Sequence, residues 1–424
     1  MKIAVITAGG AGMFCGSCMQ DNTLVRTLRL AGTDAVLVPT YTPIRVDEEN
    51  VSGERVFLGG INVYLDSTLP GWRKLPGWMI HWLNRPSIIK TLSKLGSTDA
   101  AKLGSLTLDM LKGASGPQQR EVQEFVDYLC NDLKPDVVVF SNALLSGVLS
   151  ELRPRFGGRI LCLLQGDDIF LEGLKPRWKK PVMEQLEQNC DMFDGFLTHS
   201  RFYRDFMAGY LNIKTDRFRQ IPLTIDSDDF DLIRLQPSKT ERDRFRIGYF
   251  ARICPEKGVH NLLHAAESVL STYTNADVAI AGYLGKENEK WFQRILKNST
   301  GRFPGRIHWL GSPATRQEKF QIIQDFDLLC VPTNYHEPKG LYVLEAGLAN
   351  VPSLLPDHGA FPELVQTLGF GSLYKAGDQN SLVEQLSKLV GQKVDSGLGH
   401  SERVTATSSM AATAESLRAA ICSF

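Results

Sequence analysis

The sequence predicts an α/β protein built from two Rossmann-like domains, each with a parallel sheet covered by helices. With 424 residues, the chain is longer than one ordinary hydrophobic core supports, which favours two domains. Short apolar runs alternate with segments of helical spacing, and this alternation occurs in two series. Such alternation is typical of parallel sheets, because each crossover helix returns the chain to the same edge of the sheet.

Each series contains five runs that are typical of buried strands. In the first half they are residues 2–8, 34–38, 136–140, 159–164 and 195–200, with helical spacing in 21–31 and 121–132. In the second half they are residues 245–250, 277–282, 307–311, 327–332 and 351–355. The acidic, Pro-bearing stretch IPLTIDSDDF at 221–230 separates the two series and indicates a hinge. We therefore predict domains over residues 1–225 and 226–408.

The composition narrows the classes of function. The 47 basic and 47 acidic residues give a formal net charge of zero, so charge offers no argument for a nucleic-acid partner and we expect none. The apolar run at the N-terminus is too short for a signal peptide, and no stretch approaches the roughly 20 apolar residues of a membrane span. These features favour a cytoplasmic enzyme whose eight cysteines are mostly reduced.

A turn with two cations follows the strand predicted at 245–250. Arg252 and Lys257 flank this turn, and Gly258 leads into a helix. A helix N-terminus attracts anions, and the two side chains add full positive charges, so a diphosphate suits this turn. The alternative is a solvated surface turn.

Two carboxylates follow the strand predicted at 327–332. Glu337 lies in the loop, Gly340 and Leu341 open a short helix, and Glu345 lies one turn inside it. A carboxylate inside an otherwise apolar helix is unfavourable unless it is hydrogen-bonded, and a ribose diol would be a good partner. The alternative is a glutamate that caps the helix or pairs locally.

As a set, these motifs resemble the retaining glycosyltransferases of family 4, which have the GT-B fold. The resemblance rests on Arg252, Lys257-Gly258 and Glu337-x7-Glu345. It is supported, in order, by IAGYLG (280–285), IHWLGS (307–312), DFDLLCVPT (325–333) and HGAFPELV (358–365). It covers most of residues 245–377, whereas the first half matches mainly in layout.

The resemblance implies transfer of a sugar, expected to be a hexose, from a nucleotide-diphosphate donor with retention at the anomeric carbon. Arg252 and Lys257 are then catalytic, holding the diphosphate, and Glu337 contacts the donor sugar. The remaining donor-binding residues are Glu345, on the ribose hydroxyls, and the backbone of Lys339, Gly340 and Leu341, on the phosphates.

The resemblance also sets expectations for the whole chain. It implies two parallel sheets that face a central cleft, and a C-terminal helix over 409–424 that crosses back to the first domain. We expect no cofactor and no metal, because cations and amides would neutralise the leaving diphosphate. The expected partners are a nucleotide sugar and an unknown acceptor.

The chain departs from the family pattern at several positions. Lys339 stands where the family commonly has Phe, and Gln165 stands where many members have His. Asp167 and Asp168 are therefore candidates for the cleft, as is Lys339. For the two aspartates, capping of the following helix is the favoured alternative. His199 follows the next strand and could also reach the cleft, but a structural role is favoured for it.

The glycine-rich turn after the first predicted strand has two interpretations. Gly10 and Gly12 resemble a dinucleotide fingerprint, but residues 36–40 offer no carboxylate for an adenosine ribose, which counts against NAD. In the glycosyltransferase interpretation the same glycines let the backbone approach the donor closely.

Cys15 and Cys18 have the spacing of a redox pair at a helix N-terminus. Packing around a tight turn is the favoured interpretation. Redox chemistry, including a regulatory disulfide with Cys254, is the alternative. No second Cys-x-x-Cys supports a zinc site.

The segment Trp72–Lys102 combines three tryptophans with six basic residues against one acid, Asp99. Packing or lining of an acceptor pocket is favoured over peripheral contact with the inner face of a membrane. Two rivals to the transferase remain: another GT-B enzyme such as a nucleotide-sugar epimerase or a phosphorylase, and a catalytically silent nucleotide-sugar-binding protein.

Overall fold

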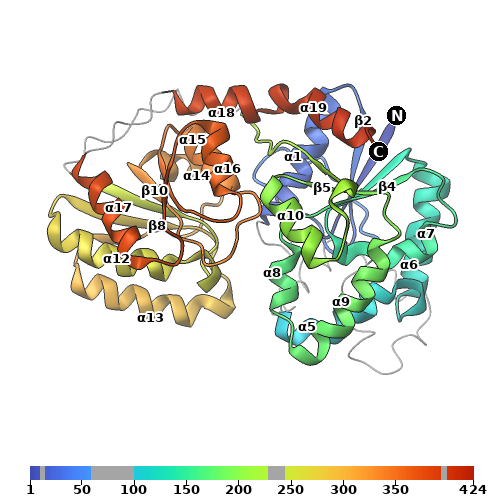
Figure 1. Ribbon diagram of the computed structural model, residues 1–424, viewed down its shortest axis with the longest axis horizontal. Helices are drawn as coiled ribbons and strands as arrows, with labels where there is room; N and C mark the ends of the chain where they lie inside the picture. The colour runs from blue at the N-terminus through green and yellow to red at the C-terminus, as the bar shows by residue number, and fades with distance from the viewer. Residues whose placement is uncertain (10–14, 59–99, 228–243, 393–398) are drawn as a thin grey trace. The chain divides into compact units, whose positions relative to one another are not determined.

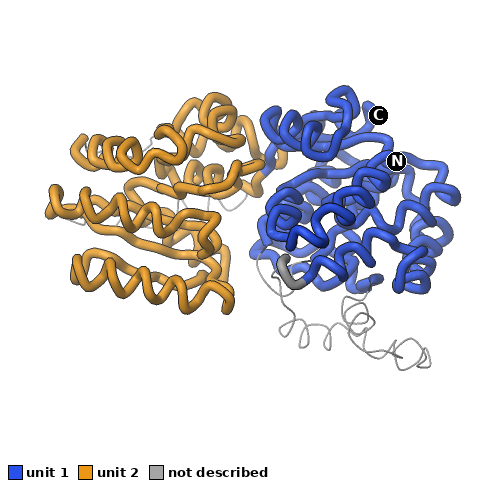
Figure 2. Tube along the Cα trace, turned by 60° about the horizontal axis from the view of Figure 1, so that its bottom comes forward, with its two compact units in different colours: residues 1–224, 413–424 blue, residues 225–412 orange. Residues whose placement is uncertain are grey.

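The computed structural model describes residues 1–9, 15–58, 100–227, 244–392 and 399–424 (Figure 1). It divides into two compact units (Figure 2). Unit 1 comprises Met1–Thr224 and Thr413–Phe424, and unit 2 comprises Ile225–Ala412. Gly10, Gly12 and residues 72–99 of the Trp72–Lys102 segment lie outside the described residues.

Unit 1 is built on a six-stranded parallel sheet with the order β2-β1-β3-β4-β5-β6. Its strands are β1 (Lys2–Thr7), β2 (Asp34–Pro39), β3 (Val137–Phe140), β4 (Arg159–Leu163), β5 (Gly195–Thr198) and β6 (Phe218–Gln220). Its helices include α1 (Gly16–Leu30), α5 (Ala100–Lys112), α6 (Gln119–Asp127), α7 (Leu149–Leu152), α8 (Asp167–Glu172), α9 (Pro176–Cys190) and α10 (Arg201–Tyr210).

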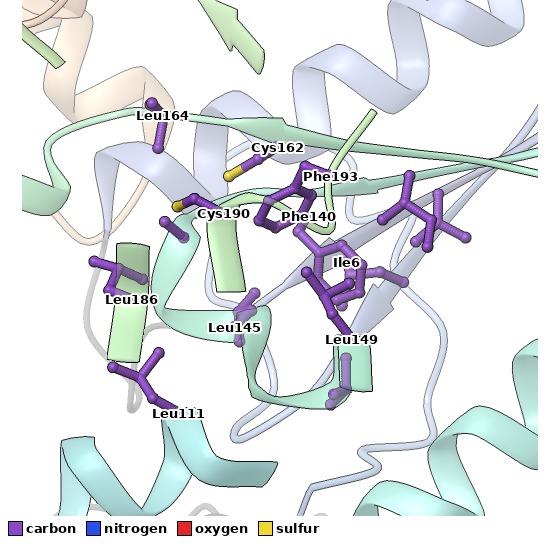
Figure 3. Packing of buried hydrophobic residues seen from close by; sticks show 14 of the residues in the cluster. Ile6, Leu111, Phe140, Leu145, Leu149, Cys162, Leu164, Leu186, Cys190 and Phe193 are labelled. Carbon is purple, nitrogen blue, oxygen red and sulfur yellow. The ribbon is translucent and has the colours of Figure 1, made fainter. Parts of the chain in front are cut away.

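Both faces of this sheet are buried. Ala4 and Ile6 belong to one apolar cluster, whereas the alternate residues Ile3 and Val5 belong to another. Figure 3 shows part of the first cluster, in which the ring of Phe140 lies beside that of Phe193. Burial on both faces explains why the inner strands read as continuous apolar runs, since these strands have no solvent-facing side.

The last helix, α19 (Met410–Cys422), completes the second cluster of unit 1. Leu417 and Ile421 are fully buried in that cluster. Arg159 Nη1 donates to the carbonyl oxygen of Cys422 at 2.9 Å, and the hydroxyls of Thr224 and Thr413 lie 3.0 Å apart. The C-terminal residues are therefore part of the core of unit 1.

Unit 2 is built on a second six-stranded parallel sheet with the order β12-β11-β10-β7-β8-β9. Its strands are β7 (Phe245–Phe250), β8 (Ala276–Ala281), β9 (Ile307–Trp309), β10 (Leu328–Cys330), β11 (Ser353–Pro356) and β12 (Ser372–Tyr374). Its helices include α12 (Val259–Thr272), α13 (Lys286–Arg302), α14 (Arg316–Gln324), α15 (Leu341–Leu348), α16 (Phe361–Leu368), α17 (Gln379–Gly391) and α18 (His400–Ser408).

The prediction of an α/β fold with two Rossmann-like parts and parallel sheets is confirmed. All ten predicted strand runs correspond to strands, but β6 and β12 were not among them. Both are edge strands, and their sequences FRQ and SLY form no continuous apolar run. Among the described residues, no helix combines the length and apolar character needed to cross a bilayer.

Candidate functional site

The carboxyl ends of β7 and β10 bring the two predicted motifs of unit 2 together. These strands are direct neighbours in the sheet, so the loops that follow them lie side by side. The backbone N–H of Asn334 donates to the carbonyl oxygen of Glu256 at 2.8 Å, and its side-chain amide donates to that of Pro255 at 2.9 Å. The loop after β10 is thus fastened to the turn that carries Lys257.

Lys257 and Glu337 form an ion pair at this edge. The Nζ–Oε2 distance is 2.6 Å, and the Lys257 ammonium also lies over the rings of Tyr335 and Tyr342, 4.9 and 5.0 Å from their centroids. The hydroxyls of Tyr335 and Tyr342 donate to the same carboxylate oxygen at 2.9 and 3.3 Å. The N–H of Gly340 donates to Oε1 at 3.4 Å.

Glu337 is ionised despite its burial. Only 4% of the residue is exposed, and burial by itself raises the pKa of its carboxyl. The charge and hydrogen bond of Lys257, with the Tyr335 hydroxyl and the charge of Lys339, outweigh burial and bring that pKa below its ordinary value. This edge therefore holds a charged carboxylate in contact with a cation.

The other cations differ in their surroundings. Arg252 is exposed, and its guanidinium forms no ion pair with any described residue. Lys339 is buried beside Glu337, with 8% of the residue exposed. The structure therefore joins Lys257 directly to Glu337, and it leaves Arg252 at the surface of the same loop.

Glu345 lies inside α15, and its carboxylate also has a basic partner. Lys319 of α14 donates to Oε1 at 2.8 Å, and both side chains are almost fully buried. Gly340 precedes α15 with φ +76°, a left-handed conformation that glycine adopts without strain. Each glutamate thus pairs with a lysine from elsewhere in unit 2, and the contacts of both glutamates with a ligand stay predictions.

Three residues of this site escaped the sequence analysis: Lys319, Tyr335 and Tyr342. Lys319 lies in the polar stretch RQEKFQ, where nothing distinguishes a buried lysine from a solvated one. The tyrosines stand two residues before and five residues after Glu337, inside a segment already singled out. The closeness of these two tyrosines to Glu337 in the sequence could have indicated that their hydroxyls contact its carboxylate.

An Asp-x-Asp sequence was also overlooked. Asp325 and Asp327 have this spacing, but they lie just before the amino end of β10, opposite the Lys257–Glu337 edge. The Asp325 carboxylate pairs with the Arg246 guanidinium, and Asp327 Oδ2 accepts the Arg246 N–H at 2.7 Å. Among the described residues, no group of three or more His, Cys, Asp or Glu side chains is placed to hold a metal ion.

The candidate residues of unit 1 are engaged in its own structure. Asp167 accepts the N–H groups of Ala143 at 2.7 Å and Gln165 at 3.1 Å. Asp168 accepts the Tyr203 hydroxyl at 2.6 Å. These contacts support the structural interpretation of both aspartates, which open α8 and are buried.

Gln165 is also held within unit 1. Its side-chain amide donates to Asp21 Oδ1 at 2.8 Å and to the carbonyl oxygen of Ser141 at 3.3 Å. His199 Nδ1 lies 3.2 Å from the carbonyl oxygen of Pro222, which suits a structural histidine. Both side chains are buried.

The eight cysteines are reduced, and the pair at the start of α1 packs into unit 1. Cys18 is buried in the second apolar cluster, Cys15 packs against that cluster, and the Thr7 hydroxyl lies 3.9 Å from Cys18 Sγ. A hydrogen bond with Cys15, together with burial, raises the pKa of the Cys18 thiol far above its ordinary value. A protonated, buried thiol favours the packing interpretation.

Residues 233–401 match the family model described as glycosyl transferases group 1. The matched residues lie within unit 2. Both ion pairs lie within the matched residues, which include Lys257, Lys319, Glu337 and Glu345. No curated protein matches the chain.

Solved structures resemble the chain along its whole length. HepE of Anabaena, in complex with UDP, is 14% identical with a TM-score of 0.66, and the alignment covers 100% of both chains. Sucrose-phosphate synthase of Thermosynechococcus elongatus is 15% identical with a TM-score of 0.69, covering 98% of this chain and 97% of the synthase. OtsA is 13% identical with a TM-score of 0.64, covering 99% of both.

At these identities the likeness shows the fold, which is GT-B with two Rossmann-like domains. Combined with the match of residues 233–401 to the group 1 model, the fold supports a GT-B glycosyltransferase.

Proposed function

We propose that this chain is a retaining glycosyltransferase of the family 4 type that takes a sugar from a nucleotide-diphosphate donor. The observation that carries the proposal is the edge, within the residues that match the group 1 model, where Lys257 contacts Glu337 beside the N-terminus of α15. A helix N-terminus and nearby cations suit a diphosphate. HepE, a structure of the same fold, was solved with UDP, which makes UDP the first nucleotide to test.

Each residue of the site has a role in this proposal. Lys257 and Arg252 bind the diphosphate and stabilise the charge that develops on the leaving group. Glu337 accepts hydrogen bonds from donor-sugar hydroxyls, and Glu345 accepts them from the ribose. The N–H groups at Gly340 and Leu341 face the phosphates, and no metal ion takes part.

Lys257 must exchange partners when the donor binds. In this structure its ammonium is neutralised by Glu337 at 2.6 Å. The two tyrosine hydroxyls also donate to Glu337, so the carboxylate keeps these two donors when Lys257 and the Gly340 N–H turn toward a phosphate. The site thus tolerates the loss of this ion pair better than an isolated buried carboxylate would.

Isothermal titration calorimetry of UDP, GDP and ADP in the presence of EDTA tests the proposal. We expect one nucleotide to bind selectively, and Glu345→Ala to weaken it by about tenfold or more, the loss of a charged hydrogen-bond acceptor. Glu384→Ala, at an exposed position of α17, is the matched control and should leave binding unchanged. If none of the three nucleotides binds, the transferase assignment is wrong.

The engaged side chain of Gln165 favours one second candidate, a nucleotide-sugar-binding protein without turnover. The residue that takes the place of the family's histidine donates to Asp21 and to Ser141, and an amide cannot act as an acid or base. Release of nucleoside diphosphate from the bound donor, measured with and without acceptors, separates the two candidates. Binding without any release across a range of acceptors would favour the silent protein.

A further inference from the structure

The ion pair between Lys319 and Glu345 is the most deeply buried one that the structure gives among the described residues. The exposed fractions of the two side chains are 5% and 7%, and the Nζ–Oε1 distance is 2.8 Å. The partners come from different helices, α14 and α15, which lie in the same unit. Burying two charges is unfavourable, and apolar residues of similar volume would often stabilise a fold equally well.

The pair constrains the Glu345 carboxylate unequally. Lys319 holds Oε1, whereas Oε2 receives no hydrogen bond from any described residue. A carboxylate oxygen offers two acceptor positions, so Oε2 retains its capacity for donors that arrive with a ligand. Because Lys319 holds Oε1, the carboxylate of Glu345 is kept in one orientation, and Oε2 can still accept a hydrogen bond. A preorganised binding group needs such a fixed orientation.

The two lysines of the site therefore differ in kind. The Lys257 side chain is 13% exposed, and the two tyrosine hydroxyls still donate to Glu337 when Lys257 moves away. Lys319 is more deeply buried, and its ammonium faces the carboxylate of Glu345. Lys257 is suited to meet a ligand, whereas Lys319 contacts the carboxylate of Glu345.

We propose that Lys319 is a positioning residue that fixes the Glu345 carboxylate so that Oε2 accepts hydrogen bonds from the vicinal diol of a nucleotide ribose. This inference rests on the proposed function, because it needs a nucleoside diphosphate at the site. In this proposal the buried charge of Lys319 helps the site to select a ribose over a 2′,3′-dideoxyribose. An apolar residue at position 319 could not do so.

The test compares a nucleoside diphosphate with its 2′,3′-dideoxy counterpart in calorimetry, using whichever of UDP, GDP and ADP binds the wild type most tightly. In the wild type the dideoxy compound should bind at least about tenfold more weakly, since it lacks the diol. Lys319→Met, which keeps the volume but removes the charge, should weaken the ribonucleotide about tenfold. The same variant should leave the dideoxy nucleotide within about twofold of the wild type.

Two further variants separate positioning from simple support of the fold. Lys319→Arg keeps a cation next to Glu345 and should recover part of the discrimination between the two ligands. Lys388→Met removes an exposed lysine of α17 and should change neither affinity. If Lys319→Met does not fold, Lys319→Gln replaces it, since the neutral amide still donates a hydrogen bond, and it should show intermediate discrimination.

The outcomes distinguish this inference from the proposed function. Equal weakening of both ligands by Lys319→Met, or unchanged affinity for both, overturns the positioning role while the nucleotide site stands. Absence of any nucleotide binding by the wild type overturns the proposed function and the inference with it.

Discussion

Glu337 and Asp167 are both buried carboxylates, and they differ in the groups that face them. Glu337 contacts the ammonium of Lys257, which brings its pKa below the ordinary value despite burial. Asp167 is faced by backbone N–H groups, and Asp168 adds a second negative charge nearby. Burial therefore dominates at Asp167 and raises the pKa of its carboxyl to about 6.

The raised pKa of Asp167 predicts a pH dependence of stability. Because the folded state binds this proton more tightly than the unfolded state, the contribution of Asp167 is greatest below pH ~4 and is lost as the pH rises through about 6. The shift corresponds to as much as about 3 kcal/mol. We compare the free energies of unfolding in urea of the wild type and Asp167→Asn. The wild-type value minus the Asp167→Asn value should decrease as the pH rises from about 4 to about 7.

Asp191→Asn serves as the control for this measurement, because the Asp191 carboxyl is exposed at the end of α9. Its difference from the wild type should stay constant over the same pH range. If the difference in unfolding free energy between the wild type and Asp167→Asn also stays constant over this pH range, Asp167 has an ordinary pKa.

At the scale of elements, the site depends on two glycines that precede helices. Gly258 leads into α12 and Gly340 into α15, with φ of +73° and +76°. A Cβ at Gly258 would lie 1.7 Å from the carbonyl oxygen of Pro332, which is two residues beyond the end of β10. The close approach of these backbones is what brings Lys257 to Glu337.

Alanine substitutions at three glycines with positive φ should separate strain from crowding. Gly377, with φ +73°, has no atom within 4 Å of the position that a Cβ would take, so Gly377→Ala should cost only the conformational strain of about 1 kcal/mol. Gly340→Ala adds contacts of 3.1 Å with Phe361 and 3.2 Å with Leu364 and should cost more. Gly258→Ala should be the most destabilising, because backbone must move to admit the Cβ.

Denaturant unfolding of unit 2 measures this order directly. A Gly258→Ala variant no less stable than Gly377→Ala would mean that the loops after β7 and β10 do not approach each other as described.

At the scale of the whole molecule, the core of unit 1 is formed by residues that are far apart in the sequence. Leu417 and Ile421 of α19 lie in one apolar cluster with Leu24, Val25 and Ile221. Phe424 contacts the chain at Gly195, and the Arg219 guanidinium lies 5.1 Å from the centroid of its ring. The integrity of unit 1 therefore depends on the segment Thr413–Phe424.

Leu417→Ala should lower the free energy of unfolding by about 2–5 kcal/mol, because the side chain is fully buried and leaves a cavity. Glu415→Ala, at an exposed position of the same helix, should change it by less than about 0.5 kcal/mol. Hydrogen exchange should place the loss of protection in the β1–β6 sheet and leave unit 2 protected. A loss confined to unit 2 would contradict the assignment of α19 to the core of unit 1.

Much of the fold could be predicted because its cause lies in neighbouring residues. The buried strands show as apolar runs, since both faces of each sheet are covered, and β1 needs no distant information to be recognised. The edge strands β6 and β12 were missed because FRQ and SLY form no continuous apolar run. The positions of Lys257, Glu337 and Glu345 could be anticipated because spacing within two short motifs placed them at strand and helix ends.

The sequence by itself determined the alternation of strands and helices, the order of the motifs and the charges available at the site, because these depend on local pattern. Only the tertiary structure decided which charges pair: Lys257 with Glu337 across 80 residues, and Lys319 with Glu345 across 26. It also decided that Asp167, Asp168 and Gln165 are held within unit 1. Such pairings arise from neighbouring strands and packed helices, so they depend on distances in space that no sequence spacing records.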